Sequence, residues 1–270
     1  MAKERQVSPP RLTQPTQDAA IGIIPARYGS SRVPAKALAD LGGQTMVERV
    51  YKKALEATTL ERVIVATDDH RIADVIAPIG EAVMTSPDHA SGSDRVAEVA
   101  RGLEAGIIVN IQGDLPLLDP TVVDKLVERL RADPSLGMAT AAVSIDSETE
   151  LKDPAVVKVV TDESGHALYF SRSPIPYDRD QPGAVRGALH HIGIYAYRRD
   201  TLLRFADLAP TRLERTEKLE QLRALENGIK IGVVEVAISG HIEVDTAEDL
   251  DAVREALAEL AEIEEPGIYD

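Results

Sequence analysis

The sequence predicts an α/β protein: a three-layer α/β/α sandwich around a mostly parallel sheet. From residue 19 onward, short runs rich in β-branched residues alternate with amphipathic segments, which is the pattern of a parallel sheet covered by helices. Apolar residues make up 44% of the 270 residues and charged residues 28%, as in folded globular chains. Since one domain of this length can bury a large core, we expect residues 19–270 to form a single domain.

Strands and helices are expected in alternation through the first half of the chain. The β-branched runs predict strands at Ile21–Pro25, Arg62–Thr67, Ile107–Ile111 and Met138–Val143. Between them, apolar residues at helical spacing predict helices, among them Met46–Ala57 and Arg71–Ile79. This order favours a parallel sheet with a helix in each crossover.

The second half of the chain has a different pattern. Strand-like runs at Val156–Thr161, Ala167–Phe170 and His191–Tyr197, separated by proline-containing turns, predict a mixed-sheet extension of the same domain. After Thr246, one helical face carries Leu250, Val253, Leu257, Leu260 and Ile263. We therefore expect an amphipathic helix there. Residues 1–18 hold three prolines and few large apolar side chains, so we expect a mobile N-terminal tail.

Charge and cysteine content exclude several classes of function. The formal net charge is −15, which repels nucleic acids and anionic membranes, so neither is an expected partner. The chain has no cysteine, which excludes disulfides, thiol catalysis and thiolate zinc sites. No apolar run approaches the roughly 18 residues of a membrane span. We expect a cytoplasmic protein whose anionic ligands are held by a local basic cluster.

Such a cluster follows the first expected strand. Residues 21–39 contain three basic residues and no acidic one. The polar members of this segment, after Pro25 and Ala26, are Arg27, Gly29, Ser30, Ser31, Arg32 and Lys36. Backbone N–H groups, hydroxyls and cations in a tight turn can hold a polyphosphate. The spacing matches neither a P-loop nor a G-x-G-x-x-G loop. The competing interpretation is a solvated basic loop.

Acidic residues follow two of the strands. Asp114 comes shortly after Ile107–Ile111, at the carboxyl end of a parallel strand, where open α/β sheets bind ligands. A carboxylate there suits Mg²⁺, and Asp245 could be its partner. However, residues 245–249 also resemble a helix capping box. Asp68 and Asp69 are likewise compatible with capping a helix or with binding a ligand.

The segment around Arg27 and eight further segments, in register, resemble the CMP-3-deoxy-manno-octulosonate synthetases, a family of cytidylyltransferases. The further segments are Val65–Asp69, Met84–Arg95, Val109–Asp114, Tyr169–Arg172, Ile175–Asp180, His191–Tyr195, Glu217–Arg223 and Val244–Leu250. The resemblance covers about residues 21–254 and implies a nucleotide-diphospho-sugar-transferase-like fold. It also implies a homodimer that transfers CMP from CTP to a small acidic acceptor, with Mg²⁺ as cofactor and pyrophosphate as the leaving group.

The resemblance implies a role for each matching residue. Catalysis is expected from Arg27, Lys36 and Asp114, and metal binding from Asp114 and Asp245. Nucleotide contacts are expected from Pro25, Ala26, Arg27, Ser30, Ser31, Arg32, Lys36, Thr67, Asp68, Ser91, Gly92, Arg95 and Gln112. Acceptor contacts are expected from Gln112, Arg172, Arg179, His191, Tyr195, Glu220 and Gln221, although Glu220 and Gln221 also fit an exposed helix face. No role is assigned to His70, His89, His166 or His241.

The chain departs from the family pattern at four places. Leu115, Ala35, His190 and the segment Asp153–Ala155 stand where the family usually has Glu, Gly, Arg and Asn-Pro-Asn. Leu115 would remove a negative charge from beside the metal site, which favours a doubly charged acceptor. The acceptor is therefore expected to be 3-deoxy-manno-octulosonate, with a phosphonate such as phosphonoformate as the alternative. A nucleotide-binding protein without turnover is a further alternative, disfavoured because Lys36, Asp114 and Asp245 are retained.

Overall fold

The structure is a computed structural model and describes residues 19–29, 33–237 and 244–264, the last four of these without their side chains. The predicted mobile tail at residues 1–18 lies outside the described residues. So do Ser30, Ser31 and Arg32 of the basic loop, and His241.

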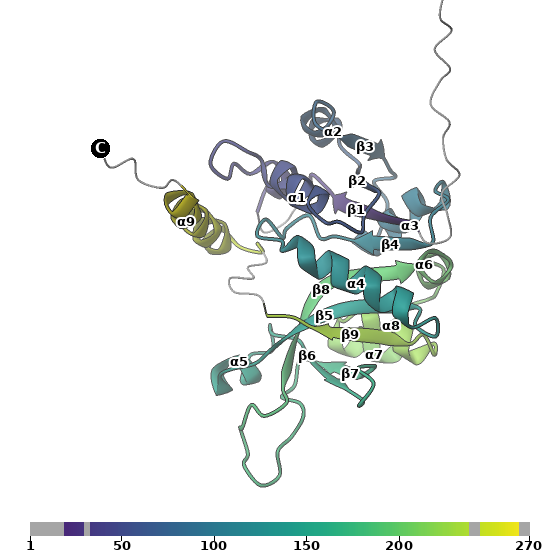
Figure 1. The fold of residues 1–270 in the computed structure, drawn as a ribbon, viewed down its shortest axis with the longest axis vertical. Helices are drawn as coiled ribbons and strands as arrows, with labels where there is room; N and C mark the ends of the chain where they lie inside the picture. The colour runs from purple at the N-terminus through teal and green to yellow at the C-terminus, as the bar shows by residue number, and fades with distance from the viewer. Residues whose placement is uncertain (1–18, 30–32, 238–243, 265–270) are drawn as a thin grey trace, which may run out of the picture.

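One nine-stranded sheet organises the described residues (Figure 1). Its strands are β1 (Ala20–Ala26), β2 (Arg62–Thr67), β3 (Glu81–Met84), β4 (Ile107–Asn110), β5 (Met138–Ser144), β6 (Lys158–Thr161), β7 (Ala167–Ser171), β8 (Leu189–Arg198) and β9 (Ile231–Glu235). They run in the order β3-β2-β1-β4-β8-β5-β9, and the β6–β7 pair is attached to β8. Strands β1 to β4 are mutually parallel, whereas β8 is antiparallel to β4 and β5. The predicted parallel sheet with a mixed extension is confirmed.

Helices cover both faces of the sheet. They are the 3-10 turn η1 (Lys36–Leu38) and the α-helices α1 (Met46–Leu55), α2 (His70–Ile76), α3 (Gly92–Arg101), α4 (Pro120–Ala132), α5 (Glu148–Lys152), α6 (Arg199–Ala206), α7 (Arg212–Glu217), α8 (Gln221–Glu226) and α9 (Ala247–Glu264). One buried cluster joins α1, α2, α4 and α9 to the sheet, and a second joins α3, α6 and α8. Two apolar clusters on opposite faces of one sheet confirm the three-layer architecture.

The predicted elements agree with the structure except at their ends. The strand at Arg62–Thr67 matches residue for residue, and the other predicted strands differ by a few residues at most. The predicted helix at Arg71–Ile79 is too long, because α2 ends at Ile76. Pro78 follows shortly after and has no N–H to donate, so the helix cannot continue through it.

The helix α9 packs on the body through only part of its predicted apolar face (Figure 1). Leu250 and Val253 are buried and Leu257 packs against the same cluster, but Leu260 is 49% exposed. The side chain of Ile263 lies outside the described residues. Arg254 donates two hydrogen bonds to the Asp40 carbonyl and so ties the helix to the segment before α1. No described helix is both long enough and apolar enough to cross a membrane.

Candidate functional site

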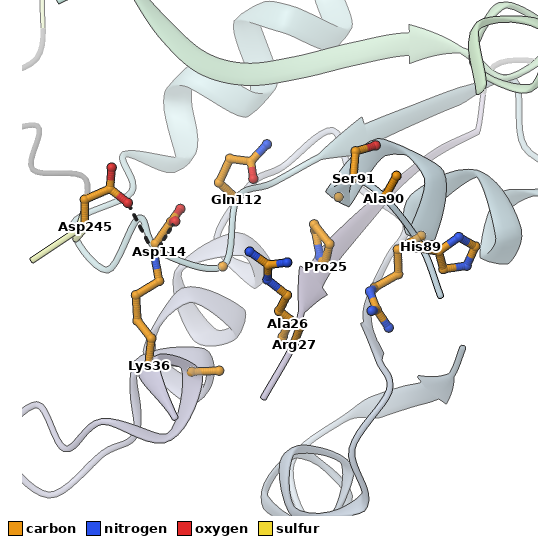
Figure 2. Close-up of a pocket in the computed structure, with 14 residues that line it drawn as sticks. Pro25, Ala26, Arg27, Lys36, His89, Ala90, Ser91, Gln112, Asp114 and Asp245 are labelled. Carbon is orange, nitrogen blue, oxygen red and sulfur yellow. Dashed lines mark hydrogen bonds and ion pairs between the residues drawn. The ribbon is translucent and has the colours of Figure 1, made fainter. Parts of the chain in front are cut away.

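A pocket of about 300 Å³ opens at the carboxyl ends of β1 and β4, beside the start of α3 (Figure 2). The described residues that line it are Pro25, Ala26, Arg27, Lys36, Ala37, His89, Ala90, Ser91, Gly92, Arg95, Gln112, Gly113, Asp114 and Asp245. It lies at the edge of the sheet where Asp114 was predicted to bind a ligand. The lining brings the predicted phosphate-binding, cytidine-binding and metal-binding residues together.

Two glycines permit the close packing around this pocket. A Cβ atom on Gly113 would lie 2.9 Å from the Pro25 carbonyl oxygen, closer than carbon and oxygen atoms approach without a shift of backbone. A Cβ on Gly92 would lie 3.3 Å from Cγ of Pro25. A side chain at Gly113 would therefore push the segment after β4 away from β1, and Asp114 with it.

Lys36 lies between the two aspartates that were predicted to bind metal. Its Nζ is 2.7 Å from Oδ2 of Asp114 and 3.7 Å from Oδ1 of Asp245. The same Nζ donates a 2.7 Å hydrogen bond to the Val244 carbonyl oxygen. The Val244 N–H donates in turn to the Asp114 carbonyl oxygen at 3.1 Å. These bonds hold the segment that carries Asp245 against the end of β4.

The two interpretations of Asp245 are now separable. The cap of α9 is made by Thr246 and Asp249: the Asp249 N–H donates to Oγ1 of Thr246 at 3.1 Å, and Oδ2 of Asp249 accepts from the Thr246 N–H at 2.8 Å. Oδ2 of Asp249 also accepts from the Asp245 N–H at 2.9 Å. The capping bonds therefore use the backbone of Asp245, and its carboxylate lies on the pocket.

The carboxylates fit a hard divalent cation. Oδ1 of Asp114 is buried and has no hydrogen-bond partner among the described residues, so it is an oxygen ligand that the protein leaves unsatisfied. Within those residues, no group of three or more His, Asp or Glu side chains is placed to hold a metal. A pair of carboxylates suits Mg²⁺ when substrate phosphates and waters supply the other ligands.

The structure also separates Asp68 from Asp69. Oδ1 of Asp69 accepts from the Arg71 N–H at 2.9 Å and caps α2. Oδ2 of Asp68 accepts from Arg95 at 2.8 Å. Thr67 is fully buried, and neither it nor Asp68 lines the pocket. Asp68 reaches the pocket only through Arg95, which is itself 4% exposed.

The start of α3 presents capped backbone N–H groups to the pocket. Ser91 caps the helix by accepting from the Asp94 N–H at 3.1 Å. The positive end of a ten-residue helix favours an anionic or electron-rich ligand. His89 also lines this side of the pocket and makes a short contact with Oε2 of Glu98. That hydrogen bond lowers the pKa of Glu98. The sequence carried no signal for His89, which was assigned no role.

Some of the predicted acceptor residues lie just beyond this pocket. Glu220 accepts from the hydroxyls of Ser91 and Ser93 at 3.1 Å and 2.9 Å, and thereby connects the start of α8 to the start of α3. Burial raises the pKa of Glu220 above its ordinary value. Gln221 is 5% exposed, so the interpretation of an exposed helix face is wrong for it. Gln112 lines the pocket itself.

The remaining predicted acceptor residues are spread more widely. The rings of His191 and Tyr195 lie 5.4 Å apart on β8, and Nε2 of His191 is 3.0 Å from the Thr140 hydroxyl. Arg172 donates to the carbonyls of Glu217 and Pro154, both at 2.8 Å. Arg179 is exposed on the long segment between β7 and β8. None of these four residues lines the pocket.

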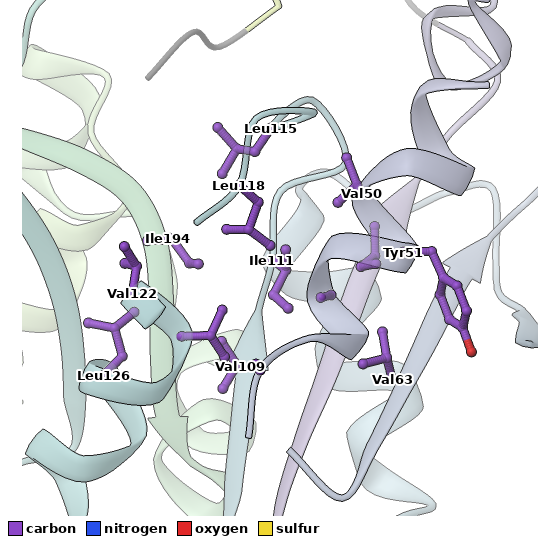
Figure 3. Close-up of a cluster of buried hydrophobic side chains, with 14 of the residues drawn as sticks. Val50, Tyr51, Val63, Val109, Ile111, Leu115, Leu118, Val122, Leu126 and Ile194 are labelled. Atoms are coloured by element: carbon purple, nitrogen blue, oxygen red, sulfur yellow. The ribbon is translucent and has the colours of Figure 1, made fainter. Parts of the chain in front are cut away.

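Leu115 does not stand beside the pocket. It is 2% exposed and belongs to the apolar cluster that also contains Ile111 and Leu118 (Figure 3). The expectation that Leu115 changes the charge next to the acceptor is therefore wrong. Its side chain points into the core and its neighbour Asp114 points into the pocket, because the chain turns sharply there, with the Leu118 N–H bonded to the Leu115 carbonyl at 3.1 Å.

Together, the fold and the pocket define a nucleotide-binding α/β protein, and comparison with known proteins makes the class specific. The family model described as cytidylyltransferase matches residues 21–231. The 3-deoxy-manno-octulosonate cytidylyltransferase of Trichlorobacter lovleyi is 51% identical over 247 residues, 88% of this chain and 98% of that protein. The enzyme of the same name from Solibacter usitatus is 50% identical over 86% of this chain and 92% of its own length. This chain belongs to the 3-deoxy-manno-octulosonate cytidylyltransferase family of nucleotidyltransferases.

Solved structures agree with this assignment. The structure of CMP:2-keto-3-deoxy-manno-octonic acid synthetase complexed with CTP has a TM-score of 0.84 to this chain at 44% identity, and the match covers 90% of this chain and 99% of that one. The 4-diphosphocytidyl-2C-methyl-D-erythritol synthase of Anaerococcus prevotii matches with a TM-score of 0.59 at 15% identity. The second likeness shows the shared fold alone.

Proposed function

We propose that this protein transfers CMP from CTP to 3-deoxy-manno-octulosonate and releases pyrophosphate. An acceptor oxygen forms a bond to the α-phosphorus of CTP, and the bond from that phosphorus to the bridging oxygen of the pyrophosphate breaks. The observation that carries the proposal is the Lys36–Asp114–Asp245 group beside the start of α3, in a family whose named members act on this sugar acid. No covalent bond to the protein is needed.

In this proposal the residues of the pocket divide the work by charge. Lys36, Arg27 and the loop that contains Ser30, Ser31 and Arg32 bind the phosphates and stabilise negative charge on the departing pyrophosphate. The cytidine lies against Ser91, Gly92, Arg95 and Gln112, with Thr67 and Asp68 behind Arg95. Asp114 and Asp245 would hold Mg²⁺, which supplies charge neutralisation to the phosphate oxygens when bound.

The acceptor is proposed to bind on the side of Glu220. Gln112 and Glu220 lie nearest, and Gln221, His191 and Tyr195 stand behind them. Arg172 and Arg179 remain in the proposal as partners for the acceptor carboxylate. The phosphonate alternative is not favoured, because its argument depended on Leu115, which is buried in the core. A homodimer in the cytoplasm, where CTP is made, completes the proposal.

Pyrophosphate release tests the reaction and its substrates together. We expect turnover with CTP and 3-deoxy-manno-octulosonate, much slower turnover with ATP or GTP, and none with phosphonoformate. Equal use of the nucleotides, or turnover with phosphonoformate alone, would contradict the proposal. Light scattering of the purified protein measures whether it is a dimer.

The variant Asp114→Asn tests the site itself. We expect it to lower kcat by at least roughly 10²-fold, the scale of a lost electrostatic contact to the transition state. Asp207→Asn is the matched control, since Asp207 is 75% exposed in a surface pair with Arg101. The control should keep wild-type activity, and unchanged circular dichroism should show that both variants fold. An Asp114→Asn enzyme as active as the control would place the reaction elsewhere.

A further inference from the structure

The ammonium group of Lys36 already fills the cation position between the two aspartates. It bonds Asp114 and the Val244 carbonyl oxygen at 2.7 Å each and faces Asp245 at 3.7 Å (Figure 2). The side chains of Lys36 and Asp114 are only 19% and 24% exposed, so this charge cluster is partly removed from water. Three oxygen atoms around one cation are the beginning of a metal coordination shell, with a lysine at its centre.

We propose that Lys36 is the resident counterion of the aspartate pair in the nucleotide-free protein. When CTP binds, its phosphates draw Lys36 away, and the pair then takes up Mg²⁺. The inference rests on the proposed function, because it assumes that the nucleotide phosphates bind at this pocket. It adds an order to that function: the protein alone binds the metal weakly, and metal and nucleotide bind together.

Charge explains why one cation must replace the other. Two neighbouring carboxylates that are partly withdrawn from water repel each other, and a cation between them relieves that repulsion. Lys36 and a metal ion cannot both occupy the position, because Lys36 already contacts the Asp114 oxygen that a metal would share. Removal of Lys36 without a replacement would leave two uncompensated charges. A replacement by Mg²⁺ leaves the group more than neutralised and ready for phosphate.

The position of Lys36 in the chain permits the exchange. Lys36 begins η1, directly after the basic loop that is proposed to hold the phosphates, and a lysine reaches either side on a flexible four-carbon stem. The phosphates therefore compete with Asp114 for the same ammonium group. They also supply the ligands that a metal lacks here, since the described part of the chain offers it a pair of carboxylates and no third acidic or histidine side chain. Both effects couple metal binding to nucleotide binding in the same direction.

The coupling must be reciprocal. If CTP increases the affinity for the metal by some factor, the metal increases the affinity for CTP by the same factor. Lys36 would account for much of that factor, because it competes with the metal only while the nucleotide is absent. A variant without this ammonium group should bind metal well on its own and gain less from CTP.

Titration of the protein with Mn²⁺, followed by the loss of the free-ion electron paramagnetic resonance signal, measures this directly. In the absence of nucleotide, we expect Lys36→Gln to bind Mn²⁺ at least ~10-fold more tightly than the wild type, a typical size for a coupling between sites. Lys36→Met should behave in the same way, and Lys36→Arg should remain weak. With CTP and no acceptor, the gain in Mn²⁺ affinity should be smaller in Lys36→Gln than in the wild type.

Two controls make the result decisive. Lys53→Gln removes a lysine that pairs with Glu56 on α1 at 3.0 Å, and it should leave Mn²⁺ binding unchanged. Asp114→Asn should weaken Mn²⁺ binding with and without CTP. If Lys36→Gln and Lys36→Met bind Mn²⁺ no more tightly than the wild type, Lys36 is not the resident counterion. That result would leave the proposed transfer reaction standing, and failure of the reaction with 3-deoxy-manno-octulosonate would leave the nucleotide-free Mn²⁺ result valid.

Discussion

Ala35 holds a backbone conformation that suits glycine, one residue before Lys36. Its φ and ψ are 52° and 34°, in the left-handed region, where a Cβ atom costs roughly 1–2 kcal/mol. The family that this chain resembles usually has glycine here. The structure therefore explains the departure: the alanine keeps the turn but is strained, and Lys36 is aimed at Asp114 nonetheless.

Ala35→Gly should relieve that strain. We expect it to raise the free energy of unfolding by up to about 1 kcal/mol, because the greater freedom of glycine in the unfolded chain offsets part of the gain. Urea denaturation measures the change. Gly42→Ala is the matched control, since Gly42 has a φ of 75° and its added Cβ would contact nothing within 4 Å. That variant should lose stability by strain alone, and a loss in Ala35→Gly would contradict the prediction.

Glu220 should carry a pH-dependent cost in stability. Its pKa is raised above the ordinary 4.5 chiefly by burial, so the folded state binds the proton more tightly than the unfolded state. Its ionisation therefore destabilises the fold at neutral pH, and this cost disappears as the pH falls through the raised pKa towards 4.5. Glu220→Gln, which stays neutral, should be more stable than the wild type at about pH 8 and equal to it near pH 4.

Thermal unfolding at several pH values tests this sign. Glu214→Gln is the opposite case: burial would raise the pKa of Glu214, but the hydrogen bond from Arg223 outweighs it and the pKa is lowered. Glu214→Gln should therefore lose stability at neutral pH and lose little in acid. The same loss in Glu220→Gln would refute the assignment. If Glu220 contacts the acceptor, Glu220→Gln should also raise the KM for the sugar acid more than the KM for CTP.

Single residues of the site were predictable where chemistry depends on the side chain. Lys36, Asp114 and Arg27 were identified because a cation or carboxylate after a buried strand is visible in the sequence. The Val244 carbonyl oxygen was not, because every residue has a carbonyl and only the fold decides which one meets a lysine. The separate tasks of Asp68 and Asp69 likewise depend on the position of Arg95, which comes from another element.

At the scale of elements, Lys158 joins three segments around the start of β6. It is fully buried, and its Nζ donates to the carbonyls of Asp153, Val156 and Arg172. Burial lowers the pKa of this lysine. The carbonyls belong to the loop before β6 and to the residue that follows β7, so one ammonium group fixes the end of the β6–β7 pair. Sequence patterns favoured a longer strand from Val156, but this anchored loop occupies its first residues.

Lys158→Met should expose how much this anchor contributes. It leaves buried carbonyl groups without donors, so we expect the free energy of unfolding to fall by about 2–4 kcal/mol. Lys152→Met on α5 is the matched control, because Lys152 is 62% exposed in a pair with Glu148. It should change stability by less than about 0.5 kcal/mol. Equal effects in chemical denaturation would show that the buried ammonium group is not an anchor.

Short elements were less visible than long ones. The strand β3 has only four residues, three partly exposed and one exposed, so it has neither a continuous apolar run nor a clear alternation. It exists because its backbone pairs with β2 in a parallel register. Pairing of this kind depends on a neighbour far away in the sequence, and local propensity is a weak guide to it.

At the scale of the whole molecule, the sequence patterns predicted the layers but not the order of the strands. Periodicity identifies which segments are strands, whereas the placement of β8 between β4 and β5 depends on packing between segments far apart in the chain. The nucleotide pocket follows from the parallel strands β1 and β4 and so was foreseeable. The meeting of Asp114 with Asp245 came only through resemblance, since nothing local in the sequence places residue 245 beside β4.

That meeting has a consequence for the synthesis of the protein. Val244 lies 208 residues beyond Lys36, which is roughly 10–40 s of translation at ordinary ribosomal speeds. During that interval the nascent chain already contains the basic loop and Asp114 but lacks their partner. A ribosome that stalls before residue 245 therefore releases a polypeptide with an incomplete carboxylate pair, and premature termination yields a protein that consumes no CTP rather than one that works with altered specificity.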